Sequence, residues 1–423
     1  MQGAELKRSS ARNAREKKLD LLLAISLCSF VFSAAYYYWR GVYRLESWPF
    51  NTSLYRPADR FNDFDNMLQI CRDLARASEE SWYLPAANLY FHLFSLIPGK
   101  LSLCLFLLMP TLGLIWYAAR TLNGFSIPRK ISYLVGIFLI SHPFLIGVDR
   151  GNLDLHLFLC LTLFVVFYEK PTRRPHEQFL AALGLGLAGA FKIFPLLFGV
   201  VYLKDRRFKE LGLTGLIFVG VTALTAQLQG GFFQSGLALF RHFGEADDIE
   251  VRVGARFNLG IFNAGRFFLD AFKLPDAMHI FEAWYLPLSG VLLIVICALA
   301  LRRSLELWRC LTALACAMCF LPVWSNDYRL LTLLLPLCLF IREQSEMTKR
   351  DYGICVLFGL LLIPKGHLII YYIADVGASE AGLATPATFL NPLLLVCLTI
   401  MVLLPTGARS LAAATAANRN PPK

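Results

Sequence analysis

Long hydrophobic runs alternate with short polar segments along nearly the whole chain. The runs cover residues 19–39, 84–98, 101–119, 131–148, 155–168, 178–203, 211–228, 284–301, 311–323, 330–341, 352–371 and 388–404. A helix of about 20 apolar residues crosses the hydrocarbon core of a bilayer. The pattern therefore predicts an all-α, polytopic membrane helical bundle with about 10–13 membrane segments. We expect one transmembrane domain over residues 19–405, between a basic cytoplasmic tail (1–18) and a second cytoplasmic tail (406–423).

The basic residues predict which side of the membrane each loop occupies. Cytoplasmic loops carry an excess of Lys and Arg, so the basic N-terminal tail is expected inside. The run 84–98 is short for a crossing, and we interpret it as a re-entrant or interfacial helix. If it crossed, the basic segment 169–174 would lie outside. If it does not cross, nearly every basic cluster lies inside, and the two loops 40–83 and 229–283 lie on the external face.

Composition agrees with a membrane protein. Hydrophobic residues make up 57% of the chain and charged residues 17%, against about 25% charged in soluble domains. The net charge of +11 is explained by cytoplasmic loops, so we expect no nucleic-acid partner. No Gly-rich phosphate loop is present, which argues against a nucleotide-binding domain. Most of the eleven cysteines lie in apolar runs, so no disulfide framework is expected.

A pair of acidic residues stands at the start of a predicted helix in the first external loop. Residues 62–78 show the apolar spacing of an amphipathic helix, as in a helix lying in the headgroup layer. One interpretation makes Asn62 or Asp63 the helix N-cap. Two acids, Asp63 and Asp65, flank one aromatic residue, which exceeds what a cap requires. We therefore favour a functional carboxylate just above the bilayer.

A tight polar reversal separates the runs 131–148 and 155–168 on the same predicted face. Its sequence is Asp149-Arg150-Gly151-Asn152-Leu153-Asp154. Gly151 permits the turn. The reversal could be a solvated turn in which Asp149 pairs with Arg150 and Asp154 caps the next helix. Its predicted position near Asp63 favours a role in substrate binding.

Lys192 interrupts an apolar run between Gly189 and Pro195. A lysine at the centre of a membrane helix costs about 2.5–3.5 kcal/mol on insertion scales. We expect two half-helices that meet near the external side, with Lys192 at the break. Snorkelling to the headgroups is the simpler interpretation. The sharper one is an ammonium facing a lipid phosphate.

Two further external segments carry candidate residues. The loop 229–283, which includes Arg256 and Asn258, is either a solvated loop or a lid that binds an anionic substrate. The segment 326–329 contains Asp327, Tyr328 and Arg329. Asp327 could pair with Arg329, or Arg329 could hold a phosphate in bidentate fashion. The isolated histidines lack metal-ligand spacing and are interpreted as structural.

These motifs, in this order, resemble those of GT-C fold glycosyltransferases, and of glycosyltransferase family 87 in particular. The resemblance rests on Asn62-Asp63-Phe64-Asp65, Arg150-Gly151-Asn152-Leu153-Asp154, the glycines of 184–189, Phe191-Lys192-Ile193-Phe194-Pro195, and Asn326-Asp327-Tyr328 followed by 330–336. The arginine-glycine-asparagine and lysine-containing elements also resemble the first mannosyltransferase of GPI-anchor synthesis. The resemblance covers roughly residues 60–340.

The resemblance implies transfer of a sugar, mannose first, from a polyprenyl-phosphate donor to a lipid or glycan acceptor on the external face of a membrane, here expected to be a bacterial inner membrane. Asp63 is assigned as general base and Lys192 as the partner of the phosphate. Asp65, Asp149 and Asp154 are expected to orient substrate or to hold a divalent metal, Mg²⁺ or Mn²⁺, and the sequence leaves both alternatives open. The rival interpretation is a transporter or flippase of a lipid-linked sugar.

Overall fold

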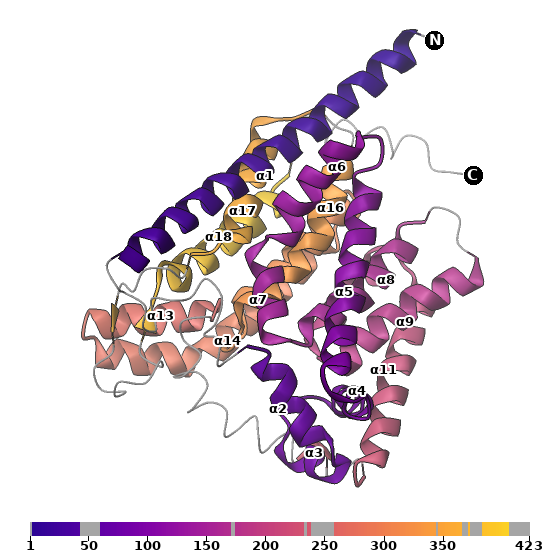
Figure 1. The fold of residues 1–423 in the computed structure, drawn as a ribbon, viewed down its shortest axis with the longest axis vertical. Coiled ribbons are helices and arrows are strands. Elements are labelled where there is room, and N and C mark those ends of the chain that lie inside the picture. Colours follow the sequence, from indigo (N-terminus) through magenta and orange to yellow (C-terminus); the bar gives the residue numbers. More distant parts are fainter. Residues whose placement is uncertain are drawn as a thin grey trace.

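The computed structural model describes residues 2–42, 60–170, 174–231, 235–237, 258–343, 346–365, 371–372 and 383–405 (Figure 1). In this part of the chain all regular structure is helical except one antiparallel pair, β1 (Tyr371–Tyr372) with β2 (Leu383–Ala384). The all-α prediction is therefore confirmed. The helices are, in chain order, α1 (Gln2–Val42), α2 (Asn62–Cys71), α3 (Leu74–Glu80), α4 (Pro85–Ser95), α5 (Gly99–Thr121), α6 (Ile127–Tyr133), η2 (Leu134–Leu139), α7 (His142–Arg150), α8 (Asp154–Tyr168), α9 (Pro175–Phe191), η3 (Phe194–Gly199), α10 (Val200–Lys204), α11 (Phe208–Leu228), α13 (Ile261–Ala271), α14 (Pro275–Ala300), α15 (Leu307–Phe320), η5 (Asp327–Leu333), α16 (Leu334–Arg342), α17 (Lys349–Leu362) and α18 (Pro386–Leu403).

Four described helices, α5, α11, α14 and α18, are long and apolar enough to cross a membrane. A fifth span exists if α6–η2 and α7, which meet at a bend of 63°, count as one. Few of the apolar side chains of α11 and α14 are buried, as expected for helices that face lipid. The protein is thus a multi-pass integral membrane protein. The expected number of about 10–13 segments also included shorter and broken helices, which this length test leaves out.

The core of the bundle is formed by α15, α16 and α8. All residues of α15 except its first, and all of α16 except its last, are buried, so these helices are enclosed all round rather than amphipathic. Around them, α8 packs against α9, α9 against α11, and α15 against α18. These shorter helices are enclosed by protein, which explains why they need not reach the length of a lipid-exposed span.

Several predicted helices are shorter or more broken than their apolar runs suggest. The run 84–98 contains α4, whose 11 residues extend about 16 Å, too short to cross the hydrocarbon core. The run 131–148 is interrupted after η2, a π-helix. The predicted helix 62–78 is two helices, because the carboxylate of Asp73 accepts a hydrogen bond from Ala75 N and starts α3 as an N-cap.

The basic segments gather at one end of the bundle. Arg15 donates to the Thr121 carbonyl (2.5 Å) at the end of α5, and Lys18 donates to the Phe340 carbonyl (2.7 Å) at the end of α16. The cations thereby satisfy carbonyls that helix ends leave without partners. The tail boundary drawn at residue 18 falls inside α1. Other ion pairs at this end join Arg129 with Glu16, Arg342 with Glu169 (2.8 Å), and Lys170 with Glu177 (2.6 Å).

Figure 1 shows α2 and α3 at the end of the molecule away from the N-terminus. Only part of the predicted loop 229–283 is among the described residues. Residues 232–234 and 238–257, which include the candidate Arg256, lie outside the described residues. The remainder contains α13, and α14 already begins at Pro275, nine residues before the predicted start at 284. The helix thus starts within the predicted external loop, since Pro at the first turn of a helix is a start signal.

Candidate active site

Asp63, Phe64 and Asp65 of the Asn-Asp-Phe-Asp motif point in different directions from the first turns of α2. Phe64 is buried against the rings of Phe91, Phe94 and Phe106, with a centroid distance of 4.7 Å to Phe106. This aromatic contact fixes α2 on α4 and α5. Asp65 is exposed and forms no side-chain hydrogen bond or ion pair in the described chain. The structure therefore does not bring it to the other candidates.

The polar reversal between α7 and α8 approaches α2 through Gly151. Its φ of 62° lies in the left-handed region, and an added Cβ would lie 2.7 Å from the Cβ of Phe64. Glycine meets both demands because it has no Cβ. Across the same contact, Phe61 N donates to the Asp149 carbonyl (2.7 Å). The reversal and the acidic motif are thus held together by backbone contacts.

We expect Gly151→Ala to destabilise the protein by about 2–4 kcal/mol, from the left-handed conformation and the contact with Phe64. Thermal unfolding of the purified protein in detergent measures this. Gly212→Ala is the matched control, because a Cβ at this helical position of α11 meets no atom within 4 Å and Ala is the better helix former. Equal unfolding temperatures for Gly151→Ala and the wild type would contradict this account of the turn.

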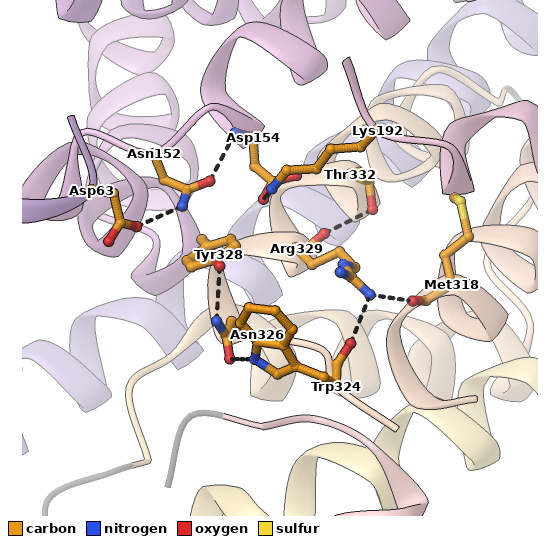
Figure 2. Close-up of polar contacts among 10 residues, drawn as sticks. All are labelled: Asp63, Asn152, Asp154, Lys192, Met318, Trp324, Asn326, Tyr328, Arg329 and Thr332. Atoms are coloured by element: carbon orange, nitrogen blue, oxygen red, sulfur yellow. Dashed lines mark hydrogen bonds and ion pairs between the residues drawn. The ribbon is translucent and has the colours of Figure 1, made fainter. Parts of the chain in front are cut away.

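Asp63 is the acidic residue of the motif that enters the polar cluster. Its Oδ1 accepts a hydrogen bond from the guanidinium of Arg150, and its Oδ2 accepts one from Asn152 Nδ2 (2.6 Å). Asn152 in turn accepts from Asp154 N (2.9 Å), so it links the acid to the start of α8 (Figure 2). The N-cap of α2 is Phe61, without a side-chain cap. The capping interpretation of Asn62 and Asp63 is therefore wrong.

Lys192 stands where predicted, at the break between α9 and η3. Its Nζ donates to Asp154 Oδ2 (2.7 Å), and it lies 5.2 Å and 5.4 Å from the ring centroids of Tyr83 and Tyr328. The side chains of the ion pair are 14% and 1% exposed. Asp154 therefore offsets the charge of Lys192, and the alternative in which Asp154 caps the next helix is wrong, because the N-cap of α8 is Leu153 without a side-chain hydrogen bond.

The segment after α15 supplies the opposite side of the cluster. Tyr328 OH accepts from Asn326 Nδ2 (2.8 Å), and Asn326 Oδ1 accepts from Trp324 Nε1 (3.1 Å). Arg329 donates from one terminal nitrogen to the Met318 carbonyl (3.1 Å) and, more weakly, to the Trp324 carbonyl (3.4 Å). Figure 2 shows these residues facing the side chains that extend from α2, α8 and the break after α9.

Asp327 does not pair with Arg329 but faces a second polar group. Its carboxylate contacts His142 Nε2 (3.2 Å) and accepts from Asn391 Nδ2 (3.2 Å). The ammonium of Lys365 lies within the electrostatic reach of Asp327 and donates to the carbonyls of Leu360 (2.6 Å) and Ile363 (2.9 Å). The sequence offered no spacing signal for His142, Lys365 or Asn391, because they come from segments far apart in the chain. The interpretation of His142 as merely structural overlooked its contact with Asp327.

Two predicted binding residues have local structural roles. Asn258 Oδ1 accepts from Gly260 N (2.9 Å) and Ser325 N (3.1 Å), so it fastens the start of α13 to the segment before η5. The carboxylate of Asp149 lies 3.7 Å from Nε of Arg60. Neither contact joins the Asp63 and Lys192 ion pairs directly.

The described residues do not assemble a recognisable divalent-metal site. No group of three or more His, Cys, Asp or Glu side chains converges in this part of the chain. The Asp63 carboxylate is occupied by Arg150 and Asn152. Mg²⁺ and Mn²⁺ favour several oxygen ligands, so these residues do not fit such an ion.

Tyr83 adds an uncharged hydroxyl to the cluster. Burial raises the pKa of Tyr83 well above its usual 10, and the nearby Tyr328 hydroxyl and the carboxylates of Asp63 and Asp154 raise it further. The phenol therefore stays protonated at physiological pH and can donate a hydrogen bond. Sequence reasoning missed it, because a tyrosine among aromatic residues gives no specific signal.

Comparison with known protein families gives one match. The model of glycosyltransferase family 87 matches residues 82–325, more than half of the chain. This range includes the 149–154 reversal and Lys192, whereas Asp63 and Asp327 lie outside it. Searches of the curated proteins and of the solved structures give no match. The expected resemblance is confirmed, and the chain belongs to glycosyltransferase family 87, a family of membrane enzymes with the GT-C fold.

Proposed function

We propose that this glycosyltransferase moves a hexose, with mannose as the first candidate, from a polyprenyl-phosphate sugar to a hydroxyl of a glycan or lipid acceptor on the external face of the membrane. The observation that carries the proposal is the placement of Asp63 in one cluster with two cations, Lys192 and Arg329. Glycosyl transfer from a lipid phosphate requires a base for the acceptor hydroxyl and cations that bind the phosphate.

Asp63 is the proposed general base. It takes the proton of the acceptor hydroxyl as that oxygen attacks the anomeric carbon. Arg150 and Asn152 each donate to one of its oxygens, which fixes the orientation of the carboxylate and leaves each oxygen a second lone pair for the acceptor. The transition state resembles an oxocarbenium ion, as in other glycosyl chemistry. A fixed carboxylate also stabilises that positive charge.

The cations on the other side of the cluster meet the leaving phosphate. Lys192 lies at the break between two helices, where irregular backbone is tolerated because protein surrounds it. Lys192 and Arg329 offer hydrogen-bond donors to phosphate oxygens, and charge-assisted bonds of this kind are the strong ones. The exposed apolar surface of α11 and α14 gives a polyprenyl chain access from the lipid.

The external location of this cluster predicts a labelling pattern. A membrane-impermeant thiol reagent applied from outside is expected to reach Gln69→Cys on α2 and not Lys209→Cys on α11, since both positions are exposed on the protein and the basic end faces the cytoplasm. Labelling is compared before and after permeabilisation, with the parent protein as background for its own cysteines. The reverse pattern would place Asp63 in the cytoplasm and contradict the proposal.

The enzyme and transporter interpretations differ in whether the sugar changes its attachment. Purified protein in liposomes is supplied with polyprenyl-phosphate mannose labelled in the sugar, together with a membrane lipid extract as acceptor. The proposal predicts a new labelled product that is absent with Asp63→Asn. A transporter would instead move intact donor between leaflets without forming that product.

A further inference from the structure

The ion pairs of the cluster leave one cation without an opposite charge. Asp63 pairs with Arg150 and Asp154 with Lys192. Among the described residues Arg329 has no carboxylate partner; it donates to two backbone carbonyls, and its guanidinium carbon lies 4.3 Å from the ring centroid of Phe194. These two acids and three cations together carry one net positive charge, which is the charge of Arg329.

Two buried polar atoms in the same cluster have no hydrogen-bond partner in the part of the chain that the structure describes. They are Nε of Arg329, a donor, and Oδ1 of Asp154, an acceptor. Leaving such a group unpaired inside a protein costs free energy, and most buried polar groups are satisfied. A ligand that brings an anionic oxygen and a hydroxyl could satisfy both atoms. A sugar phosphate has this combination.

The net charge distinguishes between classes of phosphate donor. A sugar linked to a lipid by one phosphate is a phosphodiester with a single negative charge, whereas a lipid diphosphate or a nucleotide diphosphate carries at least two. We propose that Arg329 binds the phosphodiester monoanion in the ground state, and that Lys192 leaves Asp154 to meet the second negative charge only as the sugar departs. This inference rests on the proposed function.

The charges follow the bonds that change. The acceptor hydroxyl gives its proton to Asp63 and its oxygen bonds to the anomeric carbon. The bond between that carbon and the phosphate oxygen breaks, and its electron pair stays on the phosphate. The phosphate thereby changes from a monoanionic diester to a dianionic monoester. Asp154, freed from Lys192, can accept a hydrogen bond from a sugar hydroxyl.

This division of roles predicts different kinetic effects for the two cations. An interaction made equally in the ground state and the transition state changes KM, whereas one made only in the transition state changes kcat. Removal of Arg329 is therefore expected to weaken donor binding by about 10–100-fold, the range for a charge-assisted hydrogen bond. Removal of Lys192 together with its partner Asp154 is expected to lower kcat by about 10–100-fold and to change donor binding by less than about 3-fold.

The test uses the full-length protein in detergent with a water-soluble short-chain polyprenyl-phosphate mannose as probe. Binding and transfer are measured for the wild type, Arg329→Met, Arg329→Lys, and the double variant Lys192→Met with Asp154→Asn. Arg329→Lys keeps the charge but loses the planar guanidinium, so it is expected to bind the probe more tightly than Arg329→Met and less tightly than the wild type. If the wild type binds the probe but neither the wild type nor any variant transfers mannose, the proposed function is refuted instead.

Unchanged probe affinity in Arg329→Met would overturn the inference, as would a double variant that loses affinity rather than turnover. A second measurement does not depend on the folding of any variant. The wild-type protein is titrated with a short-chain polyprenyl methyl phosphate, a monoanionic diester, and with the matching diphosphate. The diester is expected to bind at least as tightly, and a tenfold preference for the diphosphate would contradict the charge match.

Discussion

Asp63→Asn is expected to lower hexose transfer by about 10²–10⁴-fold, the range that a positioned acid or base contributes. The amide oxygen still accepts from Asn152, but the amide cannot take a proton from the acceptor, and its nitrogen faces the guanidinium of Arg150. Expression and donor binding are expected to stay nearly unchanged, because the phosphate contacts lie on the other side of the cluster. Initial rates of labelled sugar transfer measure the effect.

Asp65→Asn is the matched control for this prediction. Asp65 lies two residues further along α2 and is exposed, so the same change in charge and shape there is expected to leave turnover within about 3-fold of the wild type. This comparison separates a role in proton transfer from a general effect of negative charge on the helix. Near-normal turnover in Asp63→Asn with a large loss in Asp65→Asn would move the base to the second acid of the motif.

Lys192→Met is expected to reduce the free energy of unfolding by about 3–5 kcal/mol, because it leaves the buried carboxylate of Asp154 without its partner. The Asp154 side chain is 1% exposed, and its second oxygen has no hydrogen bond. Methionine keeps the length of the lysine, so the loss of packing is small. Unfolding in detergent, followed by tryptophan fluorescence, measures the change.

The double variant Lys192→Met with Asp154→Asn is the control, since it removes both charges of the pair. Replacing a complete buried ion pair by neutral groups is often close to neutral for stability. We therefore expect the double variant to recover most of the loss. If Lys192→Met alone is as stable as the wild type, Lys192 is in contact with water or headgroups, and the snorkelling interpretation replaces the buried pair.

The sequence predicted the position of the site better than its internal contacts. The break at Lys192 and the turn at Gly151 follow from local rules, namely the cost of a charge in an apolar run and the conformational freedom of glycine. The partners of these residues do not follow from such rules. Asp154 reaches Lys192 across the packing of α8 against α9, and Arg150 reaches Asp63 across the contact of α7 with α2, which is held by Phe64 and its aromatic neighbours.

Helix boundaries also depended on information outside the local pattern. The π-helical segment of residues 134–139 and the bend after it interrupt a run that we read as one span, although Ser141-His142-Pro143 stands at the bend. Asn391, which contacts Asp327, lies in the last helix and far from every motif in the chain. An amide in an apolar helix indicates a buried partner, and this was the signal that could have identified it.

The comparison of lipid and nucleotide donors tests the central claim most directly. Purified protein is given mannose labelled in the sugar, either as the polyprenyl phosphate or as the nucleoside diphosphate, with the same lipid acceptor extract. We expect labelled product only from the polyprenyl-phosphate donor, and loss of that product in Asp63→Asn. Product formed from the nucleoside diphosphate sugar alone would contradict the account, because it would require a donor with more than one negative charge.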